Sequence, residues 1–199
     1  MPKKDVRLAV LVSGGGSNLQ AILDAQKSGQ LSGVQVVLVL SSKGDAFALE
    51  RARQAGIDTA VVERKAYATE EAAQAATLEK LVQARADVVS LAGYMRKLSA
   101  ELVAHFRGRI LNIHPALLPK FGGPGMYGKH VHEAVLAAGE KETGCTVHVV
   151  DEEYDHGPVL AQAKVPVLPK DTVDTLSARV LEQEHKLYPK ILREFCEQL

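Results

Sequence analysis

The chain has 199 residues, and its 24 Lys and Arg residues balance its 24 Asp and Glu residues, so the formal net charge is zero. Such a composition lacks the basic excess of nucleic-acid-binding domains and the Lys/Arg clusters that anionic membrane surfaces attract. The longest apolar runs, at 6–12 and 34–40, are too short to cross a bilayer. We therefore expect neither a nucleic-acid partner nor a membrane segment.

The N-terminal residues and the two cysteines indicate the cellular compartment in which the protein is expected. The first residues lead straight into an apolar run, with no signal-peptide pattern. Cys145 and Cys196 lie far apart and lack metal-binding spacing. We interpret them as reduced thiols rather than a disulfide, and we expect a cytoplasmic protein.

Apolar runs of strand length alternate with helical periodicity along the first half of the chain. Strands are predicted at 7–13, 34–41, 59–63, 87–92 and 109–113, and helices at 19–27, 46–55, 69–85 and 99–106. This alternation predicts an α/β fold with a Rossmann-like first half. Its sheet is expected to be mostly parallel and twisted, with helices on both faces.

The pattern changes after Pro115. The sequence then predicts a glycine-rich loop at 120–129, strands at 146–150 and 159–167, and helices at 130–138 and 172–198, the last bent near Pro189. No repeat or linker interrupts the chain. We therefore expect a single domain, 1–199, with a nucleotide-binding-like half at about 7–110 and a second half at about 111–199.

Three glycines follow the first predicted strand, in the segment SGGGSN at 13–18. Glycines there let the backbone approach a ligand, and the amides that open the next helix attract anions such as phosphate. The spacing matches neither the Rossmann fingerprint nor a P-loop. A tight turn in which Ser17 or Asn18 caps the helix remains the alternative.

Asn112 and His114 lie two residues apart near the end of a predicted strand, so their side chains share one face. Ligands bind α/β folds at this end of a strand. An amide there can donate to a developing oxyanion, and an imidazole can move a proton. A structural asparagine beside a satisfied, partly buried histidine remains the alternative.

The segment DEEYDHGP at 151–158 forms an acidic turn between two predicted strands. Acidic turns are commonly only solvated, but a carboxylate near His114 would raise the histidine's pKa. Spacing does not choose which acid fills this role. The histidines and cysteines show no metal-ligand spacing, so no metal site is expected.

Five segments together resemble the folate-dependent formyltransferases, over almost the whole chain from about residue 7 to 192. They are VSGGGSNL at 12–19, LAGYMR at 91–96, LNIHPALLP at 111–119, DEEYDHGP at 151–158 and QEH at 183–185. The Asn-x-His-Pro stretch is specific to this family and to the related deformylase. The Gly-Ser-Asn-Leu loop is similar to that of the branch acting on glycinamide ribonucleotide.

The resemblance implies a role for each matching residue. Residues holding the ribonucleotide would be Gly16, Ser17, Asn18 and Glu184. Residues lining the pocket for 10-formyltetrahydrofolate, the formyl donor, would be Met95, Arg96, Lys97, Leu98, Asn112, Asp151, Glu152, Glu153, Tyr154 and Asp155. Catalytic residues would be Asn112, His114 and Asp155, which places the folate and catalytic part of the chain mainly in its second half.

The resemblance also implies the reaction. The glycinamide amine of 5-phosphoribosylglycinamide attacks the formyl carbon directly, in a step of de novo purine (IMP) synthesis. Asn112 and protonated His114 stabilise the oxyanion, His114 passes a proton to the departing folate nitrogen, and Asp155 raises the pKa of His114. No covalent enzyme intermediate is expected.

Two positions depart from the family pattern. The loop at 121–129 is longer than the common form, which leaves open a lid, an oligomer contact and a homodimer. Glu70 stands at the position where many relatives carry a ligand-contacting arginine, so that contact is not carried over to this chain, and whether Glu70 replaces the arginine stays open.

Three other functions share features with this sequence. A formyltetrahydrofolate deformylase would carry an extra N-terminal domain, and a methionyl-tRNA formyltransferase a C-terminal RNA-binding domain; we expect neither here. A non-catalytic nucleotide-binding module would leave the Asn112, His114 and Asp155 combination unexplained.

Overall fold

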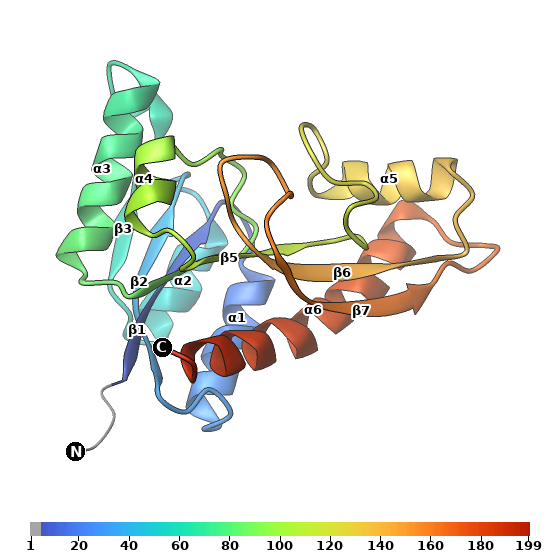
Figure 1. Ribbon diagram of the computed structural model, residues 1–199, viewed down its shortest axis with the longest axis horizontal. Coiled ribbons are helices and arrows are strands. Elements are labelled where there is room, and N and C mark those ends of the chain that lie inside the picture. Colours follow the sequence, from blue (N-terminus) through green and yellow to red (C-terminus); the bar gives the residue numbers. More distant parts are fainter. Residues whose placement is uncertain (1–4) are drawn as a thin grey trace.

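Seven strands form one mixed sheet in the computed structural model, which describes residues 5–199 (Figure 1). The strands are β1 (Val6–Val12), β2 (Val34–Ser41), β3 (Thr59–Val61), β4 (Val88–Leu91), β5 (Ile110–His114), β6 (Glu142–Val149) and β7 (Val159–Pro166). The helices are α1 (Ser17–Lys27), α2 (Phe47–Gln54), the 3-10 turn η1 (Arg64–Ala66), α3 (Glu70–Gln83), α4 (Ala100–His105), α5 (Lys129–Ala137) and α6 (Val173–Cys196).

The strand order is β3-β2-β1-β4-β5-β6-β7, parallel through the first five strands and antiparallel at β6 and β7. The chain winds outward from β1 to β3 and then returns to place β4 on the other side of β1. This reversal opens a crevice at the carboxyl ends of β1 and β4, where ligands bind such sheets.

Strand β1 is buried on both faces of the sheet. Leu8 and Val10 join the core beneath α1 and α6, whereas Ala9 and Leu11 join the core beneath α3 and α4. Figure 1 shows these two pairs of helices on opposite sides of the sheet. The predicted mostly parallel sheet with helices on both faces is therefore confirmed.

The expected elements are all present, with shifts at their ends. Helix α6 runs through Pro189, and its two halves point in different directions in Figure 1, as the predicted bend requires. Strand β6 begins at Glu142, four residues before the predicted start. Gly144 explains the extension, because a Cβ there would lie 1.9 Å from the carbonyl oxygen of Ala163 on β7.

The two predicted halves of the chain share this one sheet. Their boundary falls inside β5, which pairs with β4 on one side and β6 on the other. Residues 1–4 of the predicted domain lie outside the described residues. Within residues 5–199, no helix combines the length and apolar character needed to cross a bilayer.

Candidate functional site

A cavity of about 410 Å³ lies at the carboxyl ends of β4 and β5, beside the crevice that the strand order opens. Its walls come from the segments after β4 and β5, the β6–β7 turn, and parts of α1 and α6. We call this cavity the central pocket. Among the predicted residues, it is lined by Asn18, Met95, Arg96, Lys97, Leu98, Asn112, His114, Asp151, Glu152, Glu153, Tyr154, Asp155 and Glu184.

Gly16 and Ser17 do not line the central pocket, although they lie next to Asn18. Gly16 has φ +73° and closes the turn into α1, and a Cβ there would lie 2.6 Å from Cβ of Ala48. Only glycine fits both the left-handed backbone and this contact with α2. No side chain caps the start of α1, so the alternative in which Ser17 or Asn18 caps the helix is wrong. The amides that open α1 therefore have no side-chain cap to compete with an anion.

Asn18 instead joins α1 to α6. Its Nδ2 donates to Oε2 of Glu184 over 2.6 Å, and both side chains are buried. Burial raises the pKa of Glu184, although the Asn18 hydrogen bond acts in the opposite direction. One turn further along α6, the buried Tyr188 hydroxyl contacts Ser90 and donates to the carbonyl of Leu111, which fixes α6 against β4 and β5.

The two β5 residues reach the central pocket together, as their spacing predicts. His114 is almost fully buried. Its Nε2 lies 2.8 Å from the carbonyl oxygen of Phe121, and its Nδ1 lies 3.6 Å from Oδ1 of Asp155. A carbonyl only accepts, so Nε2 carries a proton. Nδ1 also faces an acceptor, the Asp155 carboxylate. The ring can therefore donate to both neighbours only as the doubly protonated imidazolium.

Asp155 is the acid that the fold places against His114. It has a left-handed backbone, with φ +54°, in the β6–β7 turn. Its Oδ2 accepts from the Gly123 amide at 2.9 Å, which fastens the turn to the long loop after β5. Asp151 pairs with the exposed His156 instead. Residue spacing did not show which acid of the turn lies beside His114. In the structure it is Asp155.

Burial and neighbouring groups act in opposite directions on the pKa values of His114 and Asp155. Burial lowers the pKa of His114 below its ordinary value, while Asp155 and the Phe121 carbonyl act to raise it. The expected effect of Asp155 is present, but burial outweighs it. Burial also opposes ionisation of Asp155, yet contacts with His148, His114 and the Gly123 amide together hold its pKa below the usual value.

His148 is a pocket residue that the sequence did not single out. Its Nε2 lies 3.1 Å from Nδ2 of Asn112 and 3.5 Å from Oδ1 of Asp155, so it touches two of the three predicted catalytic residues. The register of β5 and β6 puts Asn112 directly opposite His148. This register links distant parts of the chain. The alternation of His148 with Val147 and Val149 shows by itself only that His148 lies on one face of a strand.

Two neighbouring residues hold the segment after β4 in place. The amide of Met95 donates to Oγ of Ser13 over 2.9 Å, which ties the segment to the loop after β1. Arg96 pairs with Glu70 on α3, and Arg64 lies 3.2 Å from the same carboxylate. Glu70 does not line the central pocket, so its observed role is to hold Arg96.

The long loop at 121–129 forms part of the pocket wall, with Gly123, Met126 and Tyr127 among the lining residues. Gly122 lies against the β6–β7 turn, because a Cβ there would meet Asp155 Cβ at 3.1 Å and Leu118 Cδ2 at 2.6 Å. Within residues 5–199, no group of three His, Cys, Asp or Glu side chains could hold a metal ion.

Comparisons with known proteins agree with this geometry. The formyl transferase family model matches residues 6–192. The phosphoribosylglycinamide formyltransferase of Escherichia coli is 47% identical over 96% of this chain and 88% of its own length. Trifunctional purine biosynthetic proteins of animals also match, for example at 49% identity in Drosophila melanogaster, but the chain spans only 14% of that protein.

Solved structures extend the likeness to the fold. Glycinamide ribonucleotide transformylase 1 from Symbiobacterium toebii superposes with a TM-score of 0.92 at 44% identity, covering 98% of this chain and 89% of the other. Phosphoribosylglycinamide formyltransferase from Brucella melitensis gives 0.89 at 48% identity, covering 97% and 96%. The family model and these near full-length relatives together show that the chain belongs to the formyl transferase family.

Proposed function

We propose that the chain transfers the formyl group of 10-formyltetrahydrofolate to the amine of 5-phosphoribosylglycinamide, in de novo purine biosynthesis in the cytoplasm. The observation that carries the proposal is the buried His114 imidazole facing the Asp155 carboxylate beside Asn112, within one cavity. The full-length likeness to phosphoribosylglycinamide formyltransferases supports the choice of donor and acceptor.

The phosphorylated acceptor is assigned to the α1 side of the site. The uncapped amides that open α1, at Ser17 and Asn18, suit a phosphate group. The Asn18 and Glu184 pair, buried at the pocket edge, offers polar atoms to the ribose and glycinamide part. These residues position the acceptor amine relative to β5.

The folate donor is assigned to the opposite wall. The segment 95–98 and the turn 151–155 both line the central pocket, and their Met95, Leu98 and Tyr154 side chains suit a flat heteroaromatic ring. Asn112 and His114 line the same pocket, and the formyl carbon and the acceptor amine have to meet beside them.

In the proposed reaction, the acceptor nitrogen attacks the formyl carbon and an oxyanion develops. Asn112 donates a hydrogen bond to this oxygen, an interaction that can contribute about 3–4 kcal/mol. Burial lowers the pKa of His114 before the reaction. The developing negative charge raises its pKa at the moment when a charged imidazole is needed.

The proton balance closes without an enzyme nucleophile. His114 gives a proton to the departing folate nitrogen as the bond from that nitrogen to the formyl carbon breaks. The attacking nitrogen loses one proton to solvent, which balances the transfer. Asp155 holds the imidazole and stabilises its charged form through Nδ1. Nε2 must exchange the Phe121 carbonyl for a reacting group, so the 121–129 loop has to yield locally.

Hydrolysis of the donor is the second candidate, because a formyltetrahydrofolate deformylase from Pseudomonas syringae shares this fold, with a TM-score of 0.88 at 25% identity. An assay of 10-formyltetrahydrofolate with and without 5-phosphoribosylglycinamide separates the two functions. We expect donor loss only when the ribonucleotide is present. Loss at the same rate without it would overturn the proposal and favour hydrolysis.

A further inference from the structure

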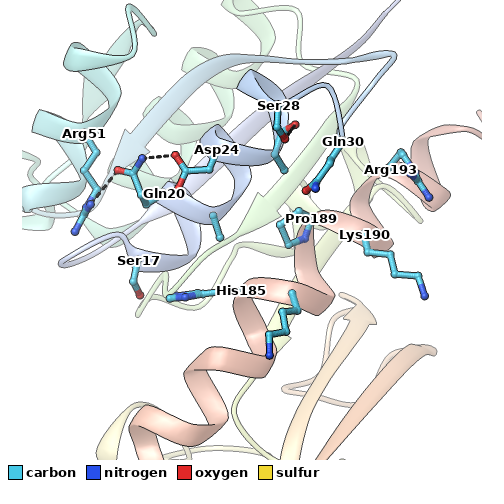
Figure 2. A pocket seen from close by; sticks show the side chains of 13 residues that line it. Ser17, Gln20, Asp24, Ser28, Gln30, Arg51, His185, Pro189, Lys190 and Arg193 are labelled. Atoms are coloured by element: carbon cyan, nitrogen blue, oxygen red, sulfur yellow. Dashed lines mark hydrogen bonds between the residues drawn. The ribbon is translucent and has the colours of Figure 1, made fainter.

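A second, larger cavity of about 980 Å³ lies between α1 and the later turns of α6 (Figure 2). Neighbouring residues divide between the two cavities: Ser17 and His185 line this one, whereas Asn18 and Glu184 line the central pocket. We call the second cavity the α1–α6 groove. One of its ends therefore lies at the loop that opens α1, next to the proposed phosphate position.

The α1–α6 groove is lined by cations although the chain as a whole is neutral. Lys186, Lys190 and Arg193 follow one another at helical spacing on α6, so they share a face. Carboxylates offset part of this charge, since Glu194 lies 3.9 Å from Lys190 and Glu197 lies 3.5 Å from Arg193. Within residues 5–199, no ion-pair partner is recorded for Lys186.

Arg51 supplies a cation from the opposite wall, close to the loop. Its Nε donates to the carbonyl of Gly15 over 2.8 Å, and its Nη1 donates to Gln20 over 2.9 Å. The guanidinium is therefore fixed against the glycine loop. Asp24, the acid that lines the groove, accepts from Gln20. Figure 2 shows this chain of contacts along α1, with His185 extending towards Ser17 and with Lys190 and Arg193 at the other end.

We propose that the α1–α6 groove is an accessory binding track for phosphorylated ligands, and that it guides the phosphate of the ribonucleotide to the amides that open α1. The proposal rests on the proposed function for the identity of its ligand. A phosphate dianion entering between Lys190 and Lys186 moves towards Arg51 and Ser17 without meeting an unpaired carboxylate of the groove.

Attraction of this kind acts mainly on association and fades with salt, because the Debye length falls from about 30 Å at 0.01 M to about 3 Å at 1 M. Clefts lined by one sign of charge raise association rates by about 10–10³. The two lysines lie outside the central pocket, so a change there tests guidance separately from chemistry.

The test reverses both charges, in Lys186→Glu/Lys190→Glu. We expect the kcat/KM for 5-phosphoribosylglycinamide to fall about tenfold in low salt, with the difference from the unmodified protein lost near 1 M salt. The matched control is Lys80→Glu/Lys164→Glu, which changes the net charge equally at exposed positions on α3 and β7. The control should keep its kcat/KM.

A binding measurement separates this proposal from the proposed function. The Kd of ribose 5-phosphate, measured by calorimetry, should rise about tenfold in low salt for the groove variant and stay unchanged for the control. Equal Kd values for both variants, or a loss of affinity that persists at high salt, would contradict the proposed role of the groove. A groove effect on ribose 5-phosphate in a protein that transfers no formyl group would overturn the proposed function alone.

Discussion

The central pocket has two walls of different construction. Asn112 and His114 lie on β5, and Glu184 lies on α6, so regular hydrogen-bonded elements fix their positions. Asp155 and Gly123 lie in a turn and a loop that hold each other through one hydrogen bond. We call the first the rigid wall, because the hydrogen bonds of a strand and a helix hold it, and the second the loop wall, because it depends on contacts between segments that are far apart in sequence.

This difference assigns separate tasks to the walls. The rigid wall presents the reacting groups and the acceptor contacts. The loop wall supplies the two groups that act to raise the pKa of His114, the Asp155 carboxylate and the Phe121 carbonyl. Changes in the rigid wall should therefore remove a function outright, and changes in the loop wall should shift its pH dependence or its efficiency.

The largest effect is expected for His114→Ala. Loss of the imidazole removes proton transfer, so kcat should fall by about 10²–10⁴ while affinity for ribose 5-phosphate stays close to normal. The matched control is His130→Ala, an exposed histidine on α5 outside the pocket lining. Near-normal turnover in the His114 variant would contradict the assignment of proton transfer to the rigid wall.

Asp155→Asn is expected to lower kcat near neutral pH by about 10²-fold. The carboxylate raises the pKa of His114, so its loss lowers that pKa further. The protonated imidazole is the active form, and activity is lost as pH rises through its pKa. The descending limb of the kcat profile should therefore move to lower pH. An unmoved limb would mean that Asp155 does not govern His114.

Glu184→Gln should act on binding more than on chemistry. The oxygen of the new amide can still accept from Asn18 Nδ2, but the pair loses the negative charge and the second acceptor oxygen of the carboxylate. We expect the KM for the ribonucleotide to rise about tenfold, equivalent to about 1.4 kcal/mol, with a smaller change in kcat. Glu182→Gln, at an exposed position on the same helix, is the control. A dominant loss of kcat would place Glu184 in the chemistry instead.

Gly122→Ala should give the smallest effect. The added methyl group would press on Asp155 and Leu118, which we expect to cost about 1 kcal/mol in stability because the Leu118 side chain can shift. Thermal unfolding measures this cost, and the kcat should fall less than for Asp155→Asn. An unchanged Tm and kcat would show that the loop wall tolerates displacement.

The same contrast explains what the sequence could predict. Strand periodicity placed Asn112 and His114 on one face because it depends only on local backbone geometry. Alternating strands and helices predicted the parallel part of the sheet for the same reason. Family resemblance, not periodicity, selected Asp155, and the structure adds the reason: the left-handed turn and the Gly123 amide aim its carboxylate at His114.

Long-range contacts account for the rest. The contact of His148 with Asn112 depends on the β5–β6 register, and the net downward shift in the pKa of His114 depends on its burial in the folded chain. The alternative of a side-chain cap on α1 was wrong, and Asn18 instead pairs with Glu184, 166 residues away. Rules that depend on residues close together in sequence do not predict these long-range contacts.

The most direct test of the account follows the formyl carbon itself. A single turnover with donor labelled at the formyl group, analysed by mass spectrometry, reports where the label goes. The account predicts that the label appears on the glycinamide nitrogen of the ribonucleotide, one for each donor consumed, and that His114→Ala slows this transfer. Release of the label as formate, with the ribonucleotide unchanged, would contradict it.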